Sequence, residues 1–194
     1  MDDEKPLTGL RLVAFCGIIS PIITFVLISL AIFNTSWFSW TENALSDLGV
    51  EGIEATLFNS GLILGGILYI PFALGIERFF RNQTLGKIGA SILLLADVLL
   101  IAIGIFPETA PNKIHLYVSV GFFLSLALSL LIQGTAMIQT PAERKLGTFT
   151  MLIVIIGLAP WILHPWKGVA IPELIAALAA TIWSCVMSMK LLRG

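Results

Sequence analysis

The side chains best suited to acid–base chemistry and metal binding gather on one side of the predicted membrane. The chain has two histidines and 12 acidic residues. Both histidines and six acids lie near segment ends that we expect to face one aqueous phase: His115, His164, Glu42, Asp47, Glu51, Glu54, Glu108 and Glu173. Imidazoles and carboxylates transfer protons and ligate metals. The sequence therefore predicts a chemically active site on one face of the protein.

His115 and His164 are the candidate metal ligands. They fall near the same ends of two consecutive apolar segments joined by a short connection, so we expect their imidazoles at similar depth. Two histidines with nearby carboxylates suit zinc or another divalent cation. The chain has no HExxH or comparable local motif to strengthen the metal hypothesis. Haem held by the two histidines is a further alternative.

Two features inside apolar segments can also take part in chemistry. His115 and Ser119 are four residues apart, so on a helix they share a face and can form a nucleophile–base pair. Helical spacing also produces such pairs without function. Asp97 lies about 13 Å inside its segment at 1.5 Å per residue. A carboxyl at that depth must be neutral, paired or hydrated, so we expect a functional contact or a structural hydrogen bond.

The elements that position these residues are transmembrane helices. The composition is 57% hydrophobic and 12% charged, whereas soluble proteins average about 25% charged residues. Six apolar segments are long enough to cross a hydrocarbon core of about 30 Å. They span residues 10–33, 57–76, 85–106, 113–139, 148–164 and 171–192. The predicted fold is all-α, a single membrane domain formed by a six-helix bundle.

The distribution of basic residues predicts the orientation of this bundle. Of the 11 Lys and Arg residues, only Lys113 and Lys167 fall on the side that holds the histidines. By the positive-inside rule, both termini are cytoplasmic and the histidines face outward, as in a multi-pass protein of the cell membrane. A net charge of −1 and the absence of a basic block predict no nucleic-acid partner.

The longest connection, residues 34–56, is expected on the outer side and is a candidate lid. A loop of this length in a small protein is usually functional. Leu45, Leu48 and Ile53 have a spacing that favours short helical turns lying on the bundle, with acids facing water.

Polar residues inside the apolar segments fall on single helical faces. Such faces are expected to pack inward and form interhelical hydrogen bonds, because unsatisfied polar groups in hydrocarbon are costly. The fourth segment carries His115, Ser119, Ser129 and Gln133, and the sixth carries Glu173, Thr181, Ser184 and Ser188.

Short motifs along the chain resemble a known family. They are Asn43-x-x-Ser46-Asp47-Leu48-Gly49, Phe58-Asn59 with Gly61 and Gly65, Gly104-x-Phe106-Pro107-Glu108, His115-x-x-x-Ser119 and Glu173. Together they resemble the prokaryotic six-helix membrane proteins of the family of unknown function 998, distantly similar to the Frag1/DRAM/Sfk1 proteins. The resemblance implies a six-helix bundle and no established activity. It also implies that Asn43, Ser46, Gly49, His115 and Glu173 form one set, although Leu174 stands where the family usually has Arg.

Three functions are compatible with these observations. The first is an outward-facing pocket that binds a lipid headgroup, a lipid-linked precursor or a small polar ligand. Its candidate residues are Asn43, Ser46, Asp47, Asp97, Glu108, His115, Ser119 and Glu173. The second is a lipid hydrolase that holds a metal through His115 and His164. The third is a structural subunit of a membrane complex. The sequence does not separate an enzyme from a binding protein, nor does it give the oligomeric state.

Overall fold

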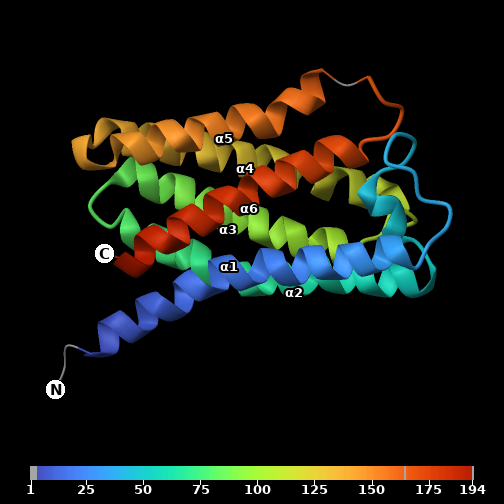
Figure 1. The fold of residues 1–194 in the computed structure, drawn as a ribbon, viewed down its shortest axis with the longest axis horizontal. Coiled ribbons are helices and arrows are strands. Elements are labelled where there is room, and N and C mark those ends of the chain that lie inside the picture. Colours follow the sequence, from blue (N-terminus) through green and yellow to red (C-terminus); the bar gives the residue numbers. More distant parts are fainter. Residues whose placement is uncertain (1–3, 164, 194) are drawn as a thin grey trace.

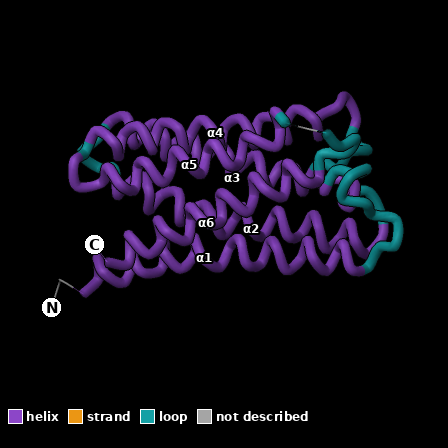
Figure 2. Tube along the Cα trace, turned by 45° about the horizontal axis from the view of Figure 1, so that its top comes forward, coloured by secondary structure: helices purple, strands orange, loops and turns teal. Residues whose placement is uncertain are grey.

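The computed structural model describes residues 4–163 and 165–193, which form an all-helical bundle. The six long helices are α1 (Glu4–Phe33), α2 (Gly52–Phe79), α3 (Thr84–Ile105), α4 (Ile114–Gln139), α5 (Arg144–Ile162) and α6 (Ala170–Arg193). The tube in Figure 2 has no strand among the described residues. All six helices are long and apolar enough to cross a membrane, so the predicted fold class is confirmed.

Several helices extend beyond the apolar segments that predicted them. Helix α2 begins at Gly52 and not at Leu57, and α5 begins at Arg144, four residues before the predicted start. The reason is that hydropathy marks only the apolar part of a helix, whereas backbone hydrogen bonding continues into its polar ends. Gly52 has a φ of 78°, a conformation that glycine adopts without steric cost, and it turns the chain into α2.

The outside of the bundle is apolar. Large hydrophobic side chains are exposed on every helix, as expected of a surface that faces lipid. Examples, one from each helix in order, are Phe15, Ile67, Leu95, Leu124, Ile155 and Ile182. This surface and the six spans identify a multi-pass membrane protein.

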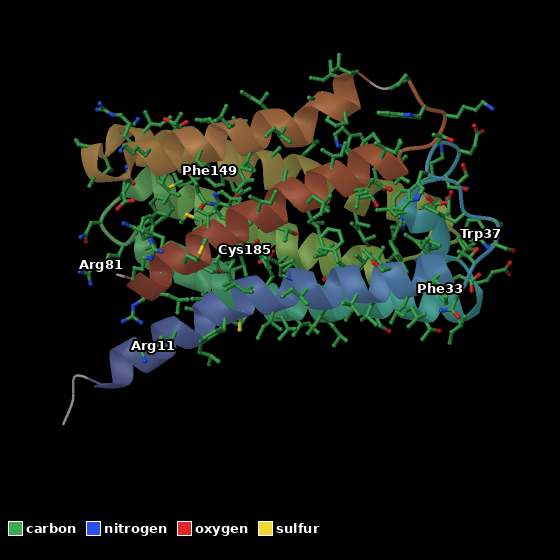
Figure 3. The ribbon with its side chains drawn as sticks, in the orientation of Figure 1. Arg11, Phe33, Trp37, Arg81, Phe149 and Cys185 are labelled. Atoms are coloured by element: carbon green, nitrogen blue, oxygen red, sulfur yellow. The ribbon has the colours of Figure 1, made fainter. Side chains whose placement is uncertain are left out.

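The helices form a ring in chain order. Each helix packs against the helices before and after it, and α6 returns to α1 to close the ring (Figure 1). The two ends of the chain lie at one end of the bundle (Figure 1). Arg11 and Arg81 lie at that end, whereas Trp37 marks the opposite end (Figure 3). That opposite end carries the 3₁₀ helix η1 (Leu45–Gly49). We call these the terminal end and the η1 end.

The half of the bundle nearest the terminal end is closely packed. Its core includes Phe72 and Trp183, neither of which is exposed to solvent. The hydroxyl of Ser129 donates to the carbonyl oxygen of Gly89 at 2.8 Å, and that of Ser184 donates to the carbonyl of Gly17 at 2.9 Å. These bonds join neighbouring helices, as the polar faces predicted. In this half, side-chain hydroxyls thus join α3 to α4 and α1 to α6.

Candidate functional site

The candidate site begins with η1, which packs over the end of the bundle. One carboxylate oxygen of Asp47 accepts hydrogen bonds from the Asn43 side-chain amide and the Ala44 backbone N–H, both at 2.9 Å. These bonds hold the turn, and Leu48 is fully buried beneath it. Ile53 is 59% exposed, so the expectation that it packs on the bundle is wrong. Helix α2 has already begun there and turns this side chain outward.

Backbone hydrogen bonds fasten the segment before η1 to the connection between α5 and α6. The N–H of Ala170 donates to the carbonyl oxygen of Asn43 at 2.9 Å, and the N–H of Gly168 donates to that of Thr41 at 2.9 Å. Two segments that are far apart in the chain thus form a single cover over the bundle.

Glu173 ties this cover to the first turn of α6. Its carboxylate accepts a hydrogen bond of 2.6 Å from the backbone N–H of Leu45. The position after Pro172, in the first turn, also suits a carboxylate because of the helix dipole. On the other side of η1, the Asn59 amide donates to the Gly49 carbonyl at 3.0 Å. The residues of the family motif at positions 43, 46, 49 and 173 therefore belong to one structural unit.

Ser46, Glu108 and His115 meet under η1. The Ser46 hydroxyl donates to Oε1 of Glu108 at 2.9 Å, and the same oxygen lies 3.9 Å from Nε2 of His115. Burial raises the pKa of the Glu108 carboxyl above its ordinary value of 4.5, and the hydrogen bond from Ser46 opposes this rise. Nearby Asp47 raises the pKa of Glu108 further, whereas His115 lowers it.

The hydrogen bonds of His115 fix its tautomer. Its Nδ1 lies 2.7 Å from the carbonyl oxygen of Phe106, which can only accept, so Nδ1 carries a proton. In the neutral ring, Nε2 then has a free lone pair and accepts from the Ser119 hydroxyl at 3.3 Å. The imidazole is 7% exposed. This geometry allows the imidazole to take the hydroxyl proton of Ser119.

A groove of about 540 Å³ lies beside these residues, between α4, α5 and the start of α6. Its polar lining consists of Ser46, Glu108, Lys113, His115, Ser119 and Glu173. Lys113 and Asn112 have φ angles of 55° and 58°, a left-handed conformation that costs non-glycine residues about 1–3 kcal/mol each. This turn opens α4 and places Lys113 at the groove.

A second, inner cavity of about 140 Å³ lies within the ring of helices. Its lining includes Asp97 and Tyr69. Four residues line both the cavity and the groove: Ser46, Ser119, Phe123 and Glu173. Asp97 is only 3% exposed, and its Oδ2 atom has no hydrogen-bond partner among the described residues. The groove and the inner cavity thus share a wall behind η1.

The structure brings most of the predicted site residues together. Seven lie in or under the η1 cover: Asn43, Ser46, Asp47, Glu108, His115, Ser119 and Glu173. Asp97 lies apart from these contacts, on the inner cavity that Ser119 also lines. His164 is outside the described residues, and within residues 4–163 and 165–193 no three His, Cys, Asp or Glu side chains form a metal-sized group. The two-histidine metal site stays a prediction.

Sequence reasoning missed three lining residues. Lys113 is one of the two cations that the sequence places on its side, but nothing in the sequence indicates its left-handed backbone. Trp161 lines the groove, and its ring centroid lies 4.9 Å from that of Phe123, with the two ring planes tilted by 56°. Tyr69 lines the inner cavity one helical turn after Gly65, and its position on a glycine-bearing face is the signal that could have identified it.

Comparison with known proteins identifies the family of the chain. No curated protein and no solved structure matches the chain significantly. The family described as "protein of unknown function (DUF998)" matches over residues 18–190. This match covers most of the chain, including every motif that suggested the resemblance. The chain therefore belongs to the DUF998 family of membrane proteins.

Proposed function

We propose that this protein binds a membrane lipid in the groove between α4 and α5, with the lipid headgroup at the η1 end. The observation that carries this proposal is the change in the groove lining along its length. Charged and hydroxyl side chains, among them Ser46, Glu108 and Lys113, line it near η1. Towards the membrane centre the lining becomes apolar, with Val120, Phe123, Leu124, Leu158 and Trp161.

The dimensions and charges of the groove support an amphipathic ligand. From His115 to Leu124, α4 rises about 13 Å at 1.5 Å per residue, enough for a headgroup and the first part of an acyl chain. Glu108 and Lys113 supply opposite charges at the polar end. The rings of Phe123 and Trp161 form an apolar wall further along. A small polar ligand would leave this wall unused.

The distribution of positive charge supports an outward position for the headgroup. Arg11 and Arg81 lie at the terminal end, away from the groove (Figure 3). Positive charge favours the cytoplasmic side, so the η1 end is proposed to face outward. The lipid would then come from the outer leaflet of the cell membrane.

A pair of matched variants on α4 tests the binding proposal. Val120 lines the groove and Leu128 does not, yet both are 48% exposed. Val120→Trp should fill the groove and remove most of the co-purifying lipid, whereas Leu128→Trp should retain it. Mass spectrometry of lipid extracted from the purified proteins measures the difference. Equal lipid content in the two variants would rule out this groove as the binding site.

Hydrolysis of an ester in the bound lipid is a second candidate function, favoured by the Ser119–His115 hydrogen bond. His115 would take the Ser119 hydroxyl proton on Nε2 while Oγ attacks the ester carbonyl carbon. The lipid alcohol would leave with the proton from Nε2, and water would then release the fatty acid from Ser119. The Phe106 carbonyl keeps Nδ1 protonated, as such a base requires.

A fluorophosphonate probe, which reacts with activated serines, separates catalysis from binding. The wild-type protein should be labelled, and Ser119→Ala should lose the label while keeping its lipid. Thr135→Ala is a control on the same helix, because the Thr135 hydroxyl only donates to a carbonyl of its own helix. A wild-type protein that binds lipid but takes no label would leave binding as the function.

A further inference from the structure

We propose that the inner cavity is a binding site for a small organic ammonium ion, whose charge pairs with Asp97. This site lies deeper than the lipid groove, with which it shares a wall, and its ligand does not require a bound lipid. Asp97 is 3% exposed and lines the cavity, and its Oδ2 atom has no hydrogen-bond partner in the described parts of the chain. A buried carboxylate without a partner is strongly disfavoured, so an ionised Asp97 requires a cation.

The charge of the cavity lining favours a cation from outside the protein. The described residues that line it include no Lys or Arg, and Glu173 is the second acid among them. None of the ion pairs formed by the described residues involves Asp97. The counter-charge is therefore absent from this part of the protein, and a bound ligand can supply it.

The chemistry of the remaining lining favours an organic ammonium over a metal ion. Five aromatic side chains line the cavity, and aromatic faces attract ammonium groups: Phe25, Phe58, Tyr69, Phe122 and Phe123. Divalent metals such as calcium and magnesium need about six oxygen ligands. Three of the lining hydroxyls already donate to backbone carbonyls, which fixes their orientation: Ser20, Thr24 and Thr181. A mostly aromatic and aliphatic wall suits the carbon part of an amine.

The volume of the cavity sets the size of this ligand. Cavities of about 150 Å³ hold one benzene-sized molecule, and this one measures about 140 Å³. The ligand class is therefore a primary amine on one ring or a short alkyl chain. Four residues line both the cavity and the groove: Ser46, Ser119, Phe123 and Glu173. This shared wall places the entry behind η1, where Glu173 attracts the cation.

Benzylamine and benzyl alcohol test the proposal, because they have nearly the same shape and only the amine is charged at neutral pH. Both are titrated into the 194-residue protein in phosphatidylcholine nanodiscs while the melting temperature is followed. Benzylamine should stabilise the wild-type protein in a saturable way. Asp97→Asn should weaken its binding about 10–100-fold, the loss expected for a hydrogen bond to a charged group. Benzyl alcohol should bind both proteins equally weakly.

Two further variants keep the test decisive. Ser188→Ala changes another buried group that has no hydrogen-bond partner among the described residues, but Ser188 does not line the cavity, so benzylamine binding should persist. Ala177→Leu fills the cavity while leaving Asp97 in place, so binding should be lost even if Asp97→Asn does not fold. Equal benzylamine binding by wild type and Asp97→Asn would overturn the proposal. So would stabilisation by sodium ions alone, or no response to benzylamine.

Discussion

The two halves of the bundle contain similar polar residues but use them differently. In the terminal half, the hydroxyls of Ser129 and Ser184 donate to glycine carbonyls of neighbouring helices. In the half at the η1 end, the side chains of Asp97, Glu108 and His115 line open space. A serine or histidine in a membrane helix is therefore not diagnostic by type. What distinguishes the two roles is whether the side chain also lines a cavity, as Ser20 and Thr24 do while they donate to the carbonyls of Gly65 and Gly61.

Helices α4 and α5 show this difference along their length. At the terminal end they touch through backbone, since a Cβ atom on Gly147 would lie 2.7 Å from the carbonyl oxygen of Gly134. At the η1 end they separate enough to leave the groove between Leu124 and Leu158. The close contact acts as a fixed point from which the helices diverge, so the groove depends on glycines at the opposite end.

The largest predicted effect comes from disrupting that fixed point. Gly147→Ala should destabilise the protein by about 1–3 kcal/mol, the usual cost of overpacking, because its Cβ would meet backbone atoms of α4. Gly157→Ala on the same helix should have no cost or a slight benefit, since its Cβ would lie 3.7 Å from its nearest neighbours. Thermal unfolding in nanodiscs measures both. Equal melting temperatures would contradict the close contact in the terminal half.

The same contrast explains what the sequence could predict. Hydrophobic segments of transmembrane length identified all six helices, because membrane spans need long apolar runs. The charge pattern of the sequence places Glu108, His115 and Glu173 on one side of the bundle. The charge pattern does not reveal the backbone partners of His115 and Glu173, because tertiary packing sets them: the Phe106 carbonyl and the Leu45 N–H. Periodicity assigns a residue to a face, but it does not show whether that face meets a helix or a cavity.

A smaller effect should separate Glu108 from carboxylates that lie in water. Burial raises the pKa of the Glu108 carboxyl in the folded state, so protonation of this carboxyl stabilises the folded protein. That stabilisation is lost as pH rises through the folded-state pKa. Glu108→Gln is neutral at every pH and its side-chain oxygen can still accept from Ser46. The melting temperature of wild type minus that of Glu108→Gln should therefore decrease from about pH 4 to about pH 8.

Glu51→Gln is the control for this pH experiment, because Glu51 is an exposed acid at the same end of the bundle. Melting temperatures of all three proteins are compared across the same buffers. A wild-type minus Glu108→Gln difference that stays constant or increases with pH would show that burial does not govern this carboxyl.

The smallest effect concerns the ion pairs at the two ends. At the terminal end, Lys190 lies 2.8 Å from Glu143, and their side chains are 39% and 19% exposed. At the η1 end, Lys167 lies 3.0 Å from Glu42, and their side chains are 82% and 53% exposed. Lys190→Met should cost up to about 1 kcal/mol, because it leaves Glu143 partly buried without its cation. Lys167→Met should cause no measurable loss, because water already solvates both partners.

Thermal unfolding at low and high salt measures both variants, and only the wild-type advantage over Lys190→Met should shrink with salt. An equal or larger loss in Lys167→Met would mean that the η1 cover is held by charge, and not by its backbone hydrogen bonds to the α5–α6 connection.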